Sequence, residues 1–129
     1  MPAKDGDVYK LLLSSTGKIF TVECVVSPPK LAQGLSGRKK LSPGNGMLFI
    51  FETLEKQTMW MPGMNFPLDI VWLDETLSVS NISYGAQPCP DKGNCPNISS
   101  VYMAKYAIEM NEGEAAIYGF MNGTQLTVV

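Results

Sequence analysis

Short apolar runs, separated by glycine, proline and polar residues, recur along most of the chain. Several runs alternate apolar and polar positions, which is the pattern of a half-buried strand, and others are short and continuously apolar. The predicted strands cover residues 8–14, 18–26, 47–51, 57–61, 68–73, 77–84, 101–110 and 125–129. This pattern predicts a domain dominated by about eight β-strands.

Two short helices are predicted between these strands. Ser27 can cap a helix N-terminus, and Pro28 suits the first helical position. That helix should end at Gly34 or Gly37, and a second helix is predicted over residues 112–118. We therefore expect an α+β fold that is predominantly β: a small antiparallel or mixed β-barrel of about eight strands with two short helices.

The length of the chain fits a single domain. Its 129 residues are 45% hydrophobic and 17% charged, which is enough apolar material for a packed core. We expect residues 1–129 to form one domain, in which the polar residues 1–7 are a flexible N-terminus. Residues 85–100 are rich in proline and glycine and are expected to form a long surface loop.

The charge balance limits the classes of partner. Ten basic and twelve acidic residues give a formal net charge of −2, whereas nucleic-acid binders need a basic excess, so no nucleic-acid partner is predicted. No apolar run reaches the roughly 18 residues of a membrane-spanning helix, so no membrane insertion by this segment is expected. The chain has no histidine, which excludes His-dependent catalytic triads and HExxH zinc sites.

The three cysteines fall into two groups. Cys24 lies in a strand-like apolar run and is expected to be a buried thiol. Cys89 and Cys95 bracket a short turn, which favours a disulfide; a two-thiolate metal site is the alternative, but it needs further ligands. A disulfide favours an extracytoplasmic location, periplasmic or secreted. A cytoplasmic location is the alternative, because residues 1–7 lack the apolar core of a signal peptide.

From residue 33 onward, short motifs of glycine, aromatic and charged residues follow in a distinctive order. They are Gly34-Leu35-x-x-Arg38, Gly46-Met47-Leu48-Phe49-x-Phe51, Trp60-Met61, Pro67-Leu68-Asp69-Ile70 and Ile108-Glu109-x-x-x-Gly113. In this order the motifs resemble the DUF192 family of uncharacterised bacterial and archaeal proteins, over roughly residues 20–128. The resemblance implies a small β-rich domain of a kind often found in exported or membrane-tethered proteins, and it implies no established activity.

The chain departs from the family pattern at two places. Ser36 stands where the family pattern has methionine, and Gly63-Met64 stands where the family usually has a polar Asn-Thr pair. If those polar groups contact a ligand in relatives, that contact is altered here.

Arg38, Asp69 and Glu109 are the charged residues within the motifs. A buried carboxylate needs a partner, and an arginine is a natural one. One interpretation is a structural clamp that fastens residues 34–38 to the sheet. Another is a cleft in which Arg38 binds an anionic ligand and Asp69 orients it. A third is acid–base catalysis by Asp69 and Glu109, as in a hydrolase or transferase.

The aromatic and methionine residues near position 60 suggest further alternatives. Trp60, Phe66 and Trp72 can form the floor of an apolar pocket or belong to the core. Met59, Met61 and Met64 carry soft thioethers that suit Cu(I), although methionine is also a common core filler.

Together these patterns favour a non-catalytic binding or accessory module for a small anionic ligand or peptide. Its expected ligand-binding residues are Arg38, Trp60, Met61, Asp69 and Glu109. No cofactor and no metal site are expected in this interpretation. The alternatives are an enzyme that uses the two carboxylates and a Cu(I)-handling protein that uses the methionines.

Overall fold

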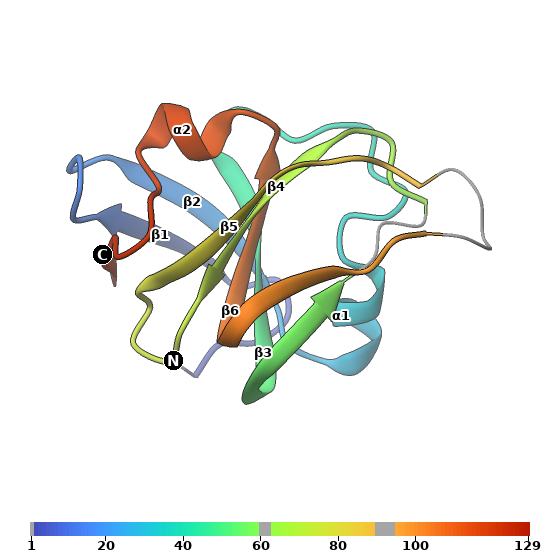
Figure 1. Cartoon of the computed structure of the whole chain (residues 1–129), viewed down its shortest axis with the longest axis horizontal. Coiled ribbons are helices and arrows are strands. Elements are labelled where there is room, and N and C mark those ends of the chain that lie inside the picture. The colour runs from blue at the N-terminus through green and yellow to red at the C-terminus, as the bar shows by residue number, and fades with distance from the viewer. Residues whose placement is uncertain (1, 60–62, 90–94) are drawn as a thin grey trace.

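The computed structural model describes residues 2–59, 63–89 and 95–129, and its main feature is a single curled sheet (Figure 1). The strands are β1 (Val8–Leu13), β2 (Ile19–Val25), β3 (Asn45–Met59), β4 (Leu68–Leu73), β5 (Val79–Ala86), β6 (Ile98–Asn111) and β7 (Leu126–Val128). The helices are α1 (Pro28–Gln33) and α2 (Glu114–Tyr118). This architecture confirms the predicted predominantly β fold with two short helices.

The sheet has the order β5-β4-β6-β3-β2-β1-β7 and curls into a half-barrel. All neighbouring strands pair antiparallel except β2 and β3, which are parallel. Its two ends approach each other at an isolated bridge between Ser78 and Gln125. The predicted barrel is therefore a mixed sheet that curls without closing along its full length.

The strand count differs from the prediction because two predicted strands are one. Residues 47–51 and the described part of residues 57–61 both belong to β3, so the described sheet has seven strands instead of about eight. The polar residues between them predicted a break, but they are the exposed part of a continuous strand. Strand β6 is also longer than expected, because it begins at Ile98, within the predicted loop of residues 85–100.

The paired strands β3 and β6 both bend sharply, and Figure 1 shows the two bends side by side at the lower edge of the molecule. Their register shifts between Ile50 and Glu55. The Lys105 Nζ atom, on β6, donates to the carbonyl oxygens of Phe51 (2.5 Å) and Glu52 (2.9 Å) at this point. The lysine therefore satisfies carbonyl groups in the stretch where the ladder is interrupted.

The sheet is apolar on both faces, and each face has its own hydrophobic cluster. The inner cluster lies within the curl and includes Phe20, Leu48, Val71, Ile108 and Phe120. The outer cluster lies on the opposite face, near α1, and includes Leu35, Met47, Phe49, Ile70 and Trp72. Successive residues of β3 alternate between these clusters, as side chains of a strand must.

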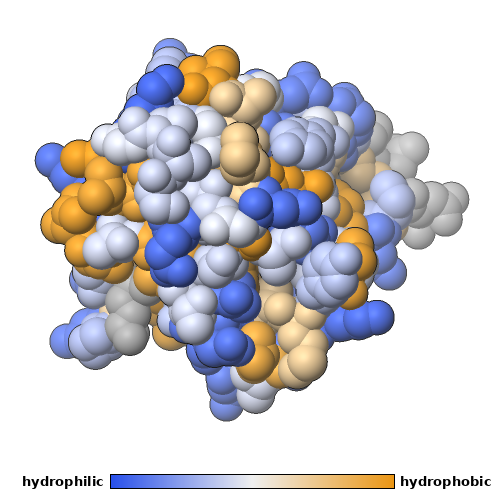
Figure 2. Space-filling model, turned by 60° about the vertical axis from the view of Figure 1, so that its left-hand side comes forward, coloured by the Kyte–Doolittle hydropathy of each residue, from blue (hydrophilic) through white to orange (hydrophobic). Residues whose placement is uncertain are grey.

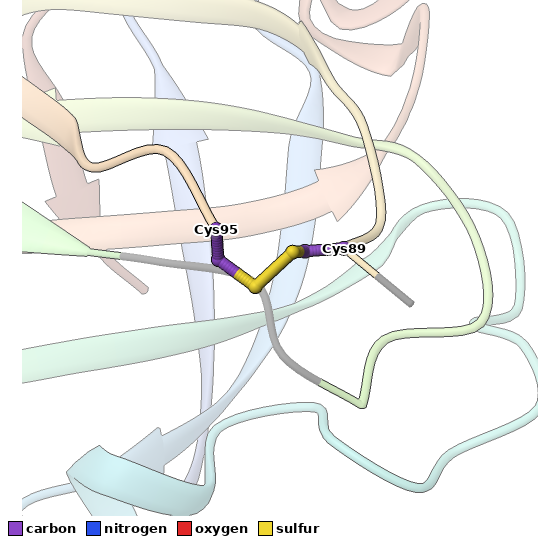
Figure 3. Close-up of a disulfide and its surroundings, with 2 residues drawn as sticks. All are labelled: Cys89 and Cys95. Atoms are coloured by element: carbon purple, nitrogen blue, oxygen red, sulfur yellow. A yellow bond between two sulfur atoms is a disulfide. The ribbon is translucent and has the colours of Figure 1, made fainter. Parts of the chain in front are cut away.

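The cysteines behave as the sequence predicts. Cys89 and Cys95 form a disulfide with a Cα–Cα distance of 5.4 Å, and it joins the segment after β5 to the segment before β6 (Figure 3). Cys24 is a free, fully buried thiol of the inner cluster. Burial, together with the charges of Asp7 and Glu23, raises the pKa of Cys24 to about 11, which makes its thiolate scarce at neutral pH.

The surface offers no dominant apolar patch on the face drawn in Figure 2. Hydrophobic and hydrophilic side chains are interspersed there, and the orange surface is divided into separate areas. Neither described helix has the length or hydrophobicity to cross a lipid bilayer.

These cysteine environments predict a stepwise thiol count. In the native protein no cysteine should react with a thiol reagent, because Cys24 is buried and the other two cysteines are oxidised. One thiol should react after denaturation without reductant, and three should react after denaturation with reductant. Mass spectrometry of the maleimide-labelled protein measures each state, and two reactive thiols in the native protein would contradict the disulfide.

Candidate functional site

Arg38 follows α1 and is fastened to strand β2. Its Nη2 atom donates to Glu23 Oε1 at 3.1 Å and to Glu23 Oε2 at 3.3 Å. The segment that carries Arg38 is thus clamped to the sheet, but by Glu23, and not by Asp69 or Glu109 as the sequence suggested. Both side chains are about 40% exposed (42% and 38%), so the ion pair contributes under roughly 1 kcal/mol to stability.

A pocket of about 240 Å³ lies beside Arg38, along the C-terminal half of α1. We call it the α1 pocket, and its lining residues are Asp5, Gly6, Glu23, Val25, Lys30, Gln33, Gly34, Arg38 and Met47. It combines two cationic and two anionic side chains with a glutamine amide. A smaller hollow of about 180 Å³ adjoins it and shares Glu23 and Arg38.

In the α1 pocket the acidic side chains already have hydrogen-bond partners, whereas several donors of the basic side chains have none among the described residues. The Ser27 hydroxyl is the main cause that lowers the pKa of Asp5, and the backbone N–H groups of Val26 (2.6 Å) and Ser27 (3.0 Å), which donate to Asp5 Oδ1, lower it further. Glu23 is engaged by Arg38. Within the described chain, Lys30 Nζ and the Nη1 and Nε atoms of Arg38 have no hydrogen-bond partner. The pocket therefore has spare donors, while its carboxylates are occupied.

A second, larger hollow lies on the other side of α1. It measures about 510 Å³ and is lined mainly by apolar residues, among them Leu31 and Phe51. Its charged lining residues are Glu52 and Lys105, and Lys105 Nζ already donates to two backbone carbonyls. No residue of α1 is fully buried, but Leu31 packs against the outer cluster, and the helix lies between the two hollows.

Glu109 lies in the middle of the sheet, where β6 pairs with Met47 of β3 and Ile70 of β4. Both neighbours belong to the outer cluster, so the Glu109 side chain points to the outer face. It is 4% exposed, and no described residue gives it a hydrogen bond or an ion pair. Burial raises the pKa of Glu109 to about 8, so this carboxyl is largely neutral at pH 7.

Asp69 is also buried, at 1% exposed, but it occupies the inner face. It pairs across β4 and β6 with Met110 of the inner cluster. Its carboxylate accepts backbone N–H groups from Gly85 (2.9 Å), Gly113 (3.0 Å) and Ala115 (3.1 Å). Asp69 thus ties together β4, β5 and the start of α2, which is a structural arrangement.

The two predicted catalytic carboxylates therefore do not converge. Asp69 and Glu109 lie on opposite faces of the sheet, so the hypothesis that they share one reaction site is wrong. For the same reason Asp69 cannot orient a ligand beside Arg38, since the α1 pocket lies on the side of Met47 and Glu109.

Three residues near these groups were not identified from the sequence. Glu23 and Lys30 line the α1 pocket, and their signal was only that of exposed positions on a strand and a helix. Glu114 is buried at 7% exposed; Gly44 N–H donates to its Oε2 at 3.1 Å, and its Oε1 is sealed without a partner. Burial is the main cause that raises the pKa of Glu114, and the charge of Asp69 adds to it.

Trp60 and Met61 lie outside the described residues. Met64 is buried in the outer cluster, and Met59 and Phe66 pack against it. Trp72 is fully buried and its Nε1 donates to Ser83 Oγ at 3.0 Å. The described members of the proposed Cu(I) group therefore serve the core, and the described chain contains no His, Cys, Asp or Glu group suited to a metal.

Comparison with solved structures defines the class: a small, curled β-sheet domain that two bacterial proteins of known structure share. A candidate transcription regulator from Sinorhizobium meliloti 1021 is 27% identical, with a TM-score of 0.86 over 98% of this chain and 97% of that one. A protein of unknown function from Novosphingobium aromaticivorans DSM 12444 is 23% identical, with a TM-score of 0.83 over 98% of this chain and 89% of that one.

The chain belongs to the DUF192 family, described as "Uncharacterized ACR", whose model matches residues 11–128. This confirms the resemblance noted from the sequence motifs. The search of curated proteins found no match. The family has no established function, and regulation of transcription is a description of the Sinorhizobium protein alone.

The contacts of Asp69 predict that Asp69→Asn destabilises the fold by at least about 2 kcal/mol, because an amide cannot accept three N–H groups as a carboxylate does. Asp7→Asn is the matched control, since Asp7 accepts one bond in an exposed turn. Urea denaturation measures both variants, and equal stabilities would show that Asp69 does not hold these elements together.

The burial of Glu109 predicts that stability falls as pH rises. The pKa of the folded state is raised from an ordinary 4.5 to about 8, so the unfolded chain releases its proton first. The stabilisation is therefore complete below about pH 4.5 and is lost toward pH 8, at up to roughly 1.4 kcal/mol per pH unit. Glu109→Gln should remove this slope and be the more stable protein at pH 8.

Urea denaturation at several pH values between 5 and 8.5 measures this difference. Glu75→Gln, at an exposed turn, is the control and should keep the wild-type slope. Parallel curves for the wild type and Glu109→Gln would rule out this linkage.

Proposed function

We propose that the protein is a non-catalytic binding module that takes a small anionic ligand in the α1 pocket. The observation that carries the proposal is the imbalance between the charged groups of this pocket. Lys30 and Arg38 keep donors without partners, whereas Asp5 and Glu23 are already bonded. An incoming anion therefore finds donors without partners, whereas both carboxylates already accept hydrogen bonds.

The chemistry of Arg38 favours a carboxylate or a similar planar anion. The guanidinium forks that hold a carboxylate through two parallel hydrogen bonds pair Nη2 with either Nη1 or Nε, so a ligand held in this way shares Nη2 with Glu23. A volume of about 240 Å³ limits the ligand to a size below that of typical drug-like molecules. We infer that the ligand is a small carboxylate, or the carboxyl end of a peptide.

The same distribution supports a binding role more than an enzymatic one. General-base catalysis needs a carboxylate or another base that is free to accept a proton from the substrate. Asp5 and Glu23 already accept hydrogen bonds, and the remaining polar side chains of the pocket are an amide and two cations.

We further propose that the protein works outside the cytoplasm. The disulfide between Cys89 and Cys95 supports this location, because such bonds persist in oxidising compartments. The thiol count predicted above also tests this proposal when the protein is alkylated inside its native cells. Free Cys89 and Cys95 in that sample would favour the cytoplasmic alternative.

The ligand proposal predicts saturable binding of succinate, a small carboxylate probe. In an NMR titration, succinate should shift amide signals around Gly34 and Arg38, and the uncharged succinamide should not. Arg38→Ala should weaken binding about tenfold, because it removes two free donors. Glu23→Gln should strengthen binding roughly threefold to tenfold, because it frees Nη2 and removes a negative charge.

Lys39→Ala is the matched control, since it removes a neighbouring exposed charge that does not line the pocket. Equal weakening by Lys39→Ala and Arg38→Ala would show that only general charge attraction is measured. A lack of saturable shifts with succinate, acetate and inorganic phosphate alike would overturn the proposal.

A further inference from the structure

Burial of the Glu109 carboxyl lowers the stability of the fold, and no hydrogen bond or ion pair from a described residue offsets this loss. A buried carboxyl without a hydrogen bond destabilises a protein, and an apolar side chain at this position would pack better. Asp69, equally buried, shows the contrast, because three backbone N–H groups satisfy it. Strongly perturbed and unpartnered groups of this kind concentrate at functional sites.

The Glu109 carboxyl adjoins the α1 pocket. A Cβ placed on Gly34, which lines this pocket, would lie 3.7 Å from Glu109 Oε1 and 3.0 Å from the ring of Phe49, so Glu109 and Phe49 lie behind Gly34. Met47, which pairs with Glu109 across β3 and β6, also lines this pocket. Glu109 therefore lies directly behind two of its lining residues.

Glu109 is also not completely buried. Among the described residues, Glu114 Oε1 is the side-chain atom that is both closed to solvent and without a partner. The Glu109 carboxyl has no partner among the described residues either, and the residue as a whole is 4% exposed.

The charged side chains of the neighbouring α1 pocket are Asp5, Glu23, Lys30 and Arg38. Glu23 lies two strands away in the same row of the sheet, and Lys30 and Arg38 come from α1 and the segment after it. The neighbouring residues of β3 and β4 in this row, Met47 and Ile70, carry no charge. A neutral Glu109 can therefore sit beside a bound anion, whereas an ionised one would repel it.

We propose that Glu109 is a ligand-binding residue of the α1 pocket, in which its protonated carboxyl donates a hydrogen bond to the bound anion. This inference rests on the proposed function and deepens it: the ligand is an anion with an oxygen that accepts this hydrogen bond. Lys30 and Arg38 supply charge at the open side of the pocket, and Glu109 supplies a neutral donor at its inner side. A carboxyl that burial keeps neutral at pH 7 is suited to this role.

The proposal requires that binding be coupled to a proton. Only protein with protonated Glu109 takes up the anion, so above about pH 8 each bound anion brings one proton with it. Succinate is a suitable probe, because its own carboxyl groups are fully ionised throughout this range.

Isothermal titration of succinate at pH 7, 8 and 9 tests this coupling. The wild-type Kd should change little between pH 7 and 8 and rise toward tenfold per unit above pH 8, with proton uptake measured in buffers of different ionisation enthalpy. Glu109→Gln keeps a neutral donor and should bind with one Kd at all three pH values. Glu109→Met has no donor and should bind about tenfold more weakly at pH 7.

Glu109→Gln also controls for every other titrating group, because it keeps Lys30, Arg38 and Glu23. Circular dichroism at each pH ensures that folded protein is compared, and both variants should be at least as stable as the wild type. If Glu109→Met binds succinate like the wild type, or if the wild type takes up no proton at pH 9, this inference is overturned while binding through Arg38 stands. If succinate binds at no pH, the proposed function itself fails.

Discussion

The antiparallel pairing of β3 with β6 is the interaction on which the rest of the structure depends. These are the two longest strands, and every other part of the sheet joins through one of them: β2 pairs with β3, and β4 pairs with β6. Their shared bend brings the far ends of both strands to the outer cluster, where Met59, Ile98 and Ala104 pack. Lys105 stabilises the bend by satisfying two carbonyl groups.

Because this pair lies in the middle of the sheet, its residues are covered on both faces. Inner residues such as Ile108 pack within the curl, and outer residues such as Ala107 pack near α1. A carboxyl in such a strand is removed from water whichever face it occupies. The fold offers Asp69 a set of backbone donors and offers Glu109 none, so two residues of similar chemistry have different roles.

The sequence predicted much of the fold, because local signals control it. Pro28 and Gly34 delimit α1, and the disulfide follows from the close spacing of Cys89 and Cys95. The continuity of β3 was not predicted, because its bend exposes polar residues that are typical of a loop. These residues form a strand because they pair with β6, which is distant in the sequence, and local composition does not reveal such a pairing.

The site was predictable only in part, for a related physical reason. Arg38 stood out because it is a charged residue in a glycine-rich motif, and it does line the α1 pocket. The faces occupied by Asp69 and Glu109 were hidden, because all six residues of β4 are buried and the strand shows no alternation of apolar and polar positions. Without that alternation, periodicity cannot tell which carboxylate points inward.

The parallel pairing of β2 and β3 has a consequence for how the α1 pocket is built. Antiparallel neighbours can be joined by a two-residue turn. Parallel neighbours need a long connection that returns from the C-terminal end of the first strand to the N-terminal end of the second. Here that connection, residues 26–44, carries α1 and Arg38, and none of the α1 residues is buried. The connection is anchored to the sheet at Leu35, which is buried in the outer cluster, and at Gly44, whose carbonyl accepts the N–H of Thr21 on β2. The half-barrel is in this sense a frame, and its crossover is the part that supplies Lys30, Gln33, Gly34 and Arg38 to the lining of the α1 pocket.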